Sequence, residues 1–188
     1  LVLTMLCCIV LGMGVPTTAN YIIMATTCAP ILATGMGLNL MAAHMFCFYF
    51  GIVADITPPV ALAAYAGSAI AKAPPMKTAW NATRLAIAAF IIPYIFAYNN
   101  ALIFVGDPGV IEVVSITVTA TFGMLSIASG LMGYLIRDMK WLTRIILIAG
   151  GLLMIYPETI SDIIGIVVLA AIFLLQRAEN AKEKKVEA

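Results

Sequence analysis

Charged side chains are scarce in this sequence, and its first 54 residues contain no Lys, Arg, Asp or Glu. Charged residues make up 10% of the 188 positions, the hydrophobic fraction is 63%, and the mean hydropathy is +1.08. A soluble fold of this length could not cover so much apolar surface with 10 basic and 9 acidic side chains. The composition therefore excludes an ordinary soluble domain and predicts an all-α polytopic membrane protein.

The sequence also lacks the usual signatures of metal, redox and nucleic-acid sites. Its four cysteines lie in apolar runs without CxxC or metal-ligand spacing, and we interpret them as small hydrophobic residues of packed helices: Cys7, Cys8, Cys28 and Cys47. His44, the single histidine, cannot build a metal site alone and is interpreted as a packed or interfacial residue. A net charge of +1 without a long basic stripe gives no reason to expect a nucleic-acid partner.

Apolar runs fill most of the chain, several of them close to the roughly 20 residues that a spanning helix needs. We expect helices over 1–11, 19–32, 38–54, 60–71, 85–98, 113–136, 141–156 and 160–175. The run 60–71 is too short to cross, which fits a re-entrant segment. The pattern divides the chain into 1–77 with the interrupted helices, 78–106 with one span and a loop, 107–176 with three scaffold spans, and a polar, disordered tail at 177–188.

The first interruption reads Gly12-Met13-Gly14-Val15-Pro16-Thr17-Thr18-Ala19-Asn20. The glycines relax the backbone, and Pro16 removes a hydrogen-bond donor and disfavours helix at the residue before it. Freed carbonyls and the Thr17 and Thr18 hydroxyls are oxygen ligands that suit a small cation, and Asn20 offers another oxygen or a donor. The N-terminus of the following half-helix favours an anion. The alternative is a plain kink whose backbone groups are satisfied by neighbouring helices.

The second interruption reads Asp55-Ile56-Thr57-Pro58-Pro59. A carboxylate deep in a bilayer costs about 2.5–3.5 kcal/mol and normally faces a cavity or a partner. The Thr-Pro-Pro run fits a tight turn followed by a helix start. The alternative is a surface loop in which Asp55 meets water. Paired interruptions of this kind indicate the binding site of a transporter, and we expect the two to approach each other because each alone offers too few oxygens for a dehydrated cation.

The order of these motifs resembles the large membrane (DctM-like) permease subunit of TRAP transporters, most closely the fused permeases of the TAXI subgroup. The resemblance covers roughly 1–106, and the last three spans match as a C-terminal extension. It implies the second of two inverted repeats, with a broken helix at Gly12, Gly14, Thr17 and Thr18 and a re-entrant hairpin tip at Asp55, Thr57, Pro58 and Pro59. Because the first repeat is absent, we interpret the chain as the C-terminal portion of a longer permease.

The resemblance also implies a function. We expect that the protein is not an enzyme and that it imports a small organic anion, a carboxylate, together with sodium. We expect it in the inner (cytoplasmic) membrane of a bacterium or archaeon. Its expected partners are a periplasmic substrate-binding protein, the remainder of the permease upstream of Leu1 and the lipid bilayer, with sodium as coupling ion and no cofactor. The expected substrate- and ion-binding residues are Gly12, Gly14, Thr17, Thr18, Asn20, Asp55, Thr57 and Pro58, of which Gly12, Gly14, Thr17, Thr18 and Asp55 would hold sodium.

Other functions and the orientation stay open on the sequence alone. A non-catalytic assembly subunit is one alternative, since it needs no substrate. An ion channel is another, but it would require a symmetric pore-lining ring. A membrane hydrolase would require a Ser or Cys nucleophile motif, which is absent. The basic residues Arg137, Lys140 and Arg144 place the C-terminus in the cytoplasm by the positive-inside rule. Counting back then places the hairpin mouth there too, whereas the resemblance expects it to open toward the periplasm.

Overall fold

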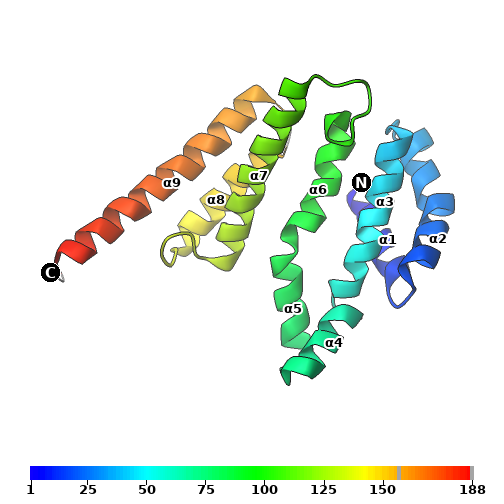
Figure 1. Ribbon diagram of the computed structural model, residues 1–188, viewed down its shortest axis with the longest axis horizontal. Coiled ribbons are helices and arrows are strands. Elements are labelled where there is room, and N and C mark those ends of the chain that lie inside the picture. The colour runs from blue at the N-terminus through cyan, green and yellow to red at the C-terminus, as the bar shows by residue number, and fades with distance from the viewer. Residues whose placement is uncertain (156–157, 187–188) are drawn as a thin grey trace. The chain divides into compact units, whose positions relative to one another are not determined.

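The computed structural model describes residues 1–155 and 158–186, and within them the chain is helical without a β-sheet (Figure 1). This confirms the predicted all-α class. The chain forms two compact units, Leu1–Pro108 and Gly109–Ala188. The first unit contains both interruptions, and the second contains the last three long helices.

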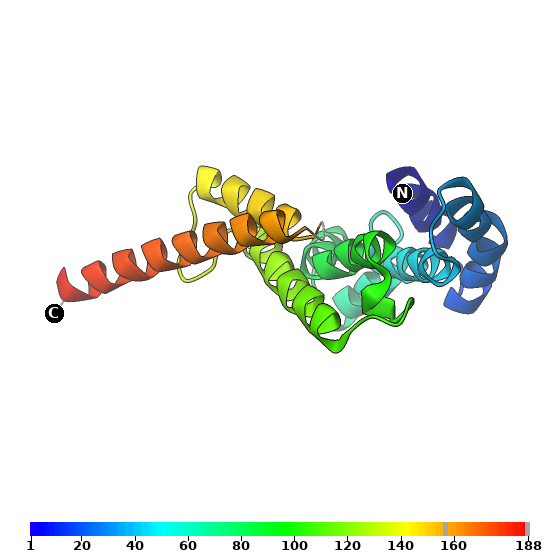
Figure 2. The ribbon, with the colours of Figure 1, turned by 90° about the horizontal axis from the view of Figure 1, so that it is seen from above.

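The first two helices form a hairpin. Helices α1 (Val2–Gly12) and α2 (Thr17–Pro30) pack against each other and against α3 (Leu40–Val53) (Figures 1 and 2). The backbone nitrogen of Leu1 lies 3.7 Å from Sδ of Met36, which follows the short π-helix η1 (Ile31–Gly35), so the open ends of the hairpin meet. The prediction of a single broken helix here was therefore wrong, because the Gly-Met-Gly-Val-Pro segment reverses the chain.

The second interruption joins two successive helical segments. Helix α3 runs into the 3-10 turn η2 (Ala54–Ile56), and α4 begins at Leu62 (Leu62–Ala71). We call the connecting residues 55–61 the Asp55 link. Within the described residues α4 packs on η2 and on α5 (Pro75–Leu85), and it makes no contact with α3. The prediction of a hairpin tip at this link was therefore also wrong, because α3, η2 and α4 together form the broken helix.

The chain reverses after α4 instead. Lys72 adopts a left-handed conformation with φ 51°, and the Ala73 amide donates to the Ser68 carbonyl at 3.0 Å, which ends α4 in a Schellman-type turn. Pro75 then begins α5, where its missing N–H costs nothing. Helix α6 (Ile87–Tyr98) follows α5 almost directly and returns along α3 (Figure 1).

The core of the first unit lies between α1, α2, α3 and α6. Its aromatic centre is Phe46, whose ring centroid is 4.7 Å from Phe50 and 5.4 Å from Tyr94, both in edge-to-face geometry. Three of the four cysteines are buried in this core, as we predicted, and Cys7 is exposed on α1. The buried core residues hold α1 and α2 against α3 and so position the turn between them.

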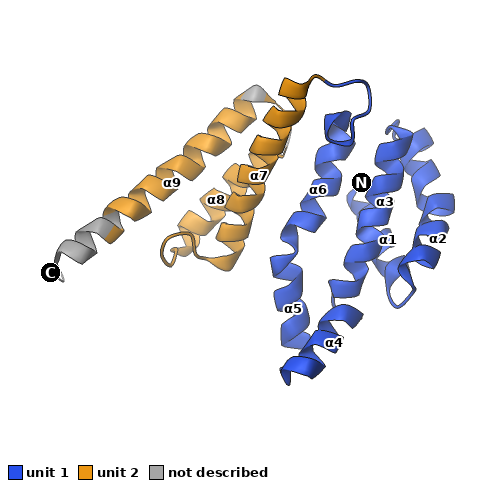
Figure 3. Cartoon of the chain, viewed as in Figure 1, with its two compact units in different colours: residues 1–108 blue, residues 109–188 orange. Residues whose placement is uncertain are grey.

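The second unit contains α7 (Val110–Met132), α8 (Trp141–Leu153) and α9 (Thr159–Val186) (Figure 3). Its helices meet at glycines: a Cβ on Gly151 would lie 2.7 Å from the Gly123 carbonyl oxygen, and one on Gly165 would lie 2.7 Å from the Gly150 carbonyl oxygen. Such small residues allow close approach of membrane helices. On α7 this close approach occurs at Gly123.

In the described part of the chain, three segments are long and apolar enough to cross a membrane: Pro75–Tyr98, Val110–Met132 and Ile160–Ala178. The first begins ten residues before the predicted span 85–98. Helix α8, with 13 residues, is shorter than the roughly 20 residues of a crossing, and part of the predicted span 141–156 lies outside the described residues. Helix α9 continues to Val186, so residues 177–186 of the predicted disordered tail are helical, and residues 187–188 lie outside the described residues. Residues 177–186 contain no Gly or Pro and consist largely of helix formers.

Candidate functional site

The tip of the first hairpin is a four-residue turn between α1 and α2. Gly14 has φ +76°, a left-handed conformation that favours glycine. Pro16, with φ −53° and ψ 138°, is the N-cap residue of α2. No side chain caps this helix, so its first-turn amides lack the usual partner. Thr17 and Thr18, the first residues of the helix, are exposed.

The backbone of the Asp55 link is held by hydrogen bonds from three side chains. The Thr57 hydroxyl donates to the Val53 carbonyl at 2.6 Å, and the Tyr65 hydroxyl on α4 donates to the Pro59 carbonyl. The Thr83 hydroxyl on α5 lies 3.0 Å from the Ile56 carbonyl and also 3.0 Å from the Ala79 carbonyl of its own helix, so its one proton is shared between the two acceptors. Tyr65 and Thr83 were not predicted from the sequence. The backbone of the link is thereby held by α3, α4 and α5.

Asp55 lies on η2 with its side chain half-buried. Among the side chains that the structure describes, none forms a hydrogen bond or ion pair with its carboxylate. Pro58, also half-buried, precedes a cis peptide bond to Pro59. Because the Thr57 hydroxyl donates to its own chain, that oxygen retains only its acceptor capacity for a ligand.

The two interruptions meet at Gly12. A Cβ on Gly12 would lie 2.6 Å from Nδ2 of Asn20 and 2.8 Å from Cβ of Ala54, the residue before Asp55. Asn20 Nδ2 donates to the Gly51 carbonyl at 3.2 Å and so ties α2 to α3. The expected approach of the two interruptions is present in the structure at this junction. It consists of Gly12, Asn20, Gly51 and Ala54, and we call it the glycine junction.

Gly51 was missed in the sequence analysis, although one signal could have revealed it. A glycine inside a helix costs about 1 kcal/mol relative to alanine, so its presence in α3 needs a packing reason. A Cβ at this position would lie 2.9 Å from Asn20 Nδ2. Gly51 therefore makes room for the Asn20 side chain, as Gly12 does from the opposite side.

Asn20 is the most informative polar residue of the junction. Its side chain is 1% exposed, and its Oδ1 atom has no hydrogen-bond partner in the described part of the chain. A buried polar atom without a partner is costly and is normally paired with protein, water or an ion. Thr17 lies three residues earlier on the same face of α2. The Oδ1 atom is therefore available as a ligand for a cation.

Gly14 and His44 are two further residues that the sequence singled out. Gly14 belongs to the turn next to it, and a Cβ there would meet nothing within 4 Å. His44 is half-buried on α3 and its Nδ1 lies 3.1 Å from the Tyr21 hydroxyl, which agrees with its interpretation as a packed residue. No group of three or more His, Cys, Asp or Glu side chains with metal-binding geometry occurs among the described residues.

We predict that Thr83→Val detaches the Asp55 link from α5. The substitution keeps the shape of the side chain but removes the bond to Ile56, so we expect a loss of about 1 kcal/mol in the free energy of unfolding. Thr78→Val is the matched control, because the Thr78 hydroxyl bonds only to Pro74 at the start of its own helix. Thermal unfolding of the two purified variants tests this, and equal melting temperatures would contradict it.

The all-helical chain, its membrane-length helices and the two polar interruptions that meet at a buried amide are typical of a membrane transport protein. A sequence model of the family described as tripartite ATP-independent periplasmic transporter, DctM component, matches residues 1–107. This is more than half of the 188 residues, and the chain belongs to this family. The match ends close to the boundary of the first unit.

The family fixes the general role of the chain. It is a multi-pass permease component of a transport system and not an enzyme. Membership implies that it works with a periplasmic binding protein and other components of the tripartite system, and it suggests the cytoplasmic membrane as location. No curated protein matches the chain. No solved structure matches it either.

Proposed function

We propose that the chain is the permease part of a sodium-coupled, binding-protein-dependent transporter of a small organic anion, of the fused TAXI type. The observation that carries this proposal is the unpartnered Oδ1 atom of Asn20, buried where the hairpin tip meets the residue before Asp55. The remainder of the same permease would complete the site.

Sodium binding would draw on both interruptions. Oxygen atoms are the ligands that hard cations prefer, and the junction offers Asn20 Oδ1 together with backbone carbonyls of the hairpin turn. The Thr17 and Thr18 hydroxyls lie on the adjacent first turn of α2 and bond to no other described group. Asp55, next to Ala54, would supply negative charge directly or through a neighbouring ligand.

The anion would be held by the start of α2. This helix has 14 residues, no acidic residue in its first turn and no side-chain cap, so its amides and its dipole favour a carboxylate. Neither interruption contains an arginine. A helix terminus and hydroxyl groups therefore take the role that a basic side chain has in many anion sites.

We predict that Thr17→Val, Thr18→Val and Asp55→Asn each weaken the activation of uptake by sodium. Each change removes an oxygen ligand or a charge while keeping the size of the side chain. Hydrogen bonds and similar contacts to charged groups contribute about 1.5–3 kcal/mol, so we expect the sodium concentration for half-maximal uptake to rise by at least about tenfold in the most affected variant. Uptake is measured in proteoliposomes with the complete transporter and its binding protein.

Thr26→Val is the matched control for these variants. Thr26 is on the same helix and is also exposed, but its hydroxyl bonds to the Ile22 carbonyl of its own helix at 3.1 Å. It should leave sodium activation unchanged. If all three site variants have the sodium dependence of the unmodified protein, the proposed site is refuted. Uptake that needs no sodium at all would refute the proposed coupling ion.

A further inference from the structure

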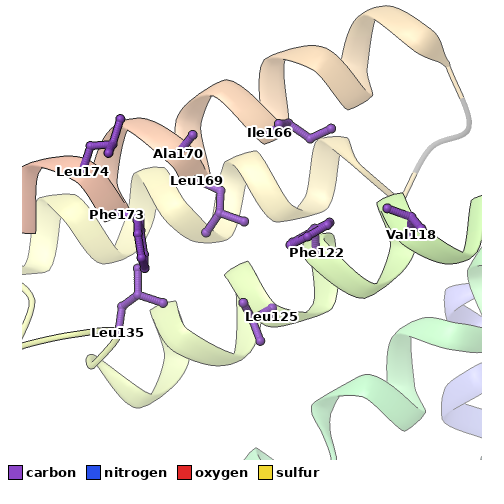
Figure 4. Close-up of a pocket in the computed structure, with 9 residues that line it drawn as sticks. All are labelled: Val118, Phe122, Leu125, Leu135, Ile166, Leu169, Ala170, Phe173 and Leu174. Atoms are coloured by element: carbon purple, nitrogen blue, oxygen red, sulfur yellow. The ribbon is translucent and has the colours of Figure 1, made fainter. Parts of the chain in front are cut away.

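The second unit has an open groove between α7 and α9, and none of the proposed sodium- and anion-binding residues line it. Its volume is about 490 Å³, within the roughly 300–1,000 Å³ range of pockets that hold small ligands. All lining side chains are apolar (Figure 4), and they are Val118, Phe122, Leu125, Leu135, Ile166, Leu169, Ala170, Phe173 and Leu174. On α9 the lining runs from Ile166 to Leu174, about 12 Å at 1.5 Å per residue, which approaches the depth of one bilayer leaflet.

The lining differs from the contacts between the helices of this unit. Those contacts use glycines, as at Gly123 with Gly151 and at Gly150 with Gly165, and small residues are what membrane helices use to approach closely. The groove presents large aromatic and branched side chains, among them Phe122 and Phe173, and its only small residue is Ala170. A flexible chain can fill the space between these side chains, whereas another helix could not approach them closely. The surface therefore suits a flexible chain better than a further helix.

One end of the groove is basic. Leu135, Phe173 and Leu174 lie together at this end (Figure 4). Just beyond them Gln176 Oε1, on a side chain that is 6% exposed, accepts the backbone N–H groups of Ile136 at 3.0 Å and Arg137 at 3.4 Å. The loop is thereby fastened to α9.

Basic side chains follow immediately on both segments. Arg137 and Lys140 lie on the loop, and Arg177 follows Gln176 on α9; the acidic neighbours in the sequence are Asp138 and Glu179. Lys140 and Arg177 are exposed. The other end of the groove leads toward the start of α9, with Glu158 and Asp162, so the charge along the groove is strongly asymmetric.

We propose that this groove holds an acyl chain of one anionic phospholipid, whose phosphate lies at the basic end beside Lys140 and Arg177. The apolar lining removes the acyl chain from contact with other lipids along most of one leaflet. The basic side chains select a negatively charged headgroup, since each Lys or Arg near an anionic lipid surface contributes about 1 kcal/mol. The site lies outside the residues that carry the transport function and does not depend on it.

Native mass spectrometry of the detergent-solubilised transporter that contains this chain tests the proposal, with phosphatidylglycerol and phosphatidylethanolamine as probes. We expect one phosphatidylglycerol to bind more tightly than phosphatidylethanolamine. Lys140→Gln and Arg177→Gln should each weaken phosphatidylglycerol about fivefold, the equivalent of about 1 kcal/mol, and should leave phosphatidylethanolamine unchanged. Equal binding of the two lipids by the unmodified protein would overturn the proposal.

A second pair of variants tests the groove itself. Ala170→Trp fills the groove and should abolish the tightly bound phosphatidylglycerol. Val167→Trp adds the same indole at an exposed position of α9 that does not line the groove, and it should retain the lipid. Equal retention by both variants would overturn the proposal. So would the absence of any bound lipid in the unmodified protein, which would assign the groove to another protein segment.

Discussion

Gly12→Ala is expected to reduce sodium-dependent uptake at least tenfold and to lower the melting temperature of the transporter. The added Cβ would lie 2.6 Å from Asn20 Nδ2 and 2.8 Å from the Ala54 Cβ, and the Ala54 atom is attached directly to the backbone and cannot rotate away. Overpacking of this kind costs about 1–3 kcal/mol. The strain falls on the contact between the hairpin and the Asp55 link, so transport should suffer more than overall stability.

Two other glycines separate packing from backbone effects. Gly67, on α4, has nothing within 4 Å of its Cβ position and an ordinary helical conformation. Gly67→Ala should therefore leave uptake unchanged and raise the melting temperature slightly, because alanine is favoured over glycine inside a helix by about 1 kcal/mol. Gly14 also has open space, but its φ of +76° is unfavourable for alanine by about 1–2 kcal/mol. Gly14→Ala should therefore lower stability without the clash at Asn20. Normal uptake by Gly12→Ala would mean that the glycine junction does not stay closed during transport.

The positions of the two interruptions could be predicted from the sequence, but their roles could not. A Gly- and Pro-containing segment between two apolar runs looks the same whether the chain continues or reverses there. The choice depends on which helices can approach closely. Here Gly12, Gly51 and Ala54 allow α1 and α2 to fold together against α3, and these contacts join residues about 30 to 40 positions apart. The resemblance correctly indicated the family but assigned the broken helix and the hairpin in the opposite order.

Contacts that fasten the site were missed for the same reason. Thr83 reaches the Ile56 carbonyl from 27 residues away, and no local pattern marks that threonine among the others of the chain. Tyr65 bonds to the Pro59 carbonyl because α4 begins just beyond the link. Asn20 was predicted as a ligand, whereas its donor bond to Gly51 could be recognised only in the structure.

The two ends of the Asn20 side-chain amide differ in their surroundings, and two possible roles of this residue can be separated by experiment. The Nδ2 group donates to the Gly51 carbonyl and ties α2 to α3, while the Oδ1 atom is buried and has no partner among the described residues. A purely structural asparagine needs only the first contact. A sodium ligand needs the second, and the negative end of the amide dipole must then face the ion.

If Asn20 binds sodium, Asn20→Ala should therefore weaken the activation of uptake by sodium more than Asn20→Asp does. Alanine removes the oxygen, so we expect the sodium concentration for half-maximal uptake to rise about 10- to 100-fold, in line with about 1.5–3 kcal/mol for a contact to a charged group. Aspartate keeps an oxygen at the Oδ1 position and adds negative charge, which should preserve sodium activation. Its second oxygen, however, replaces Nδ2 and faces the Gly51 carbonyl, so both atoms are acceptors and the melting temperature should fall.

The comparison gives opposite orders for the two roles. If Asn20 binds sodium, Asn20→Ala has the weaker sodium activation even though Asn20→Asp has lost the tie to Gly51. If Asn20 only holds α2 against α3, Asn20→Asp is the more impaired variant in both measurements, because a buried charge facing a carbonyl costs more than a small cavity. Sodium titration of uptake and thermal unfolding of both variants, in the complete transporter, decide between the two roles.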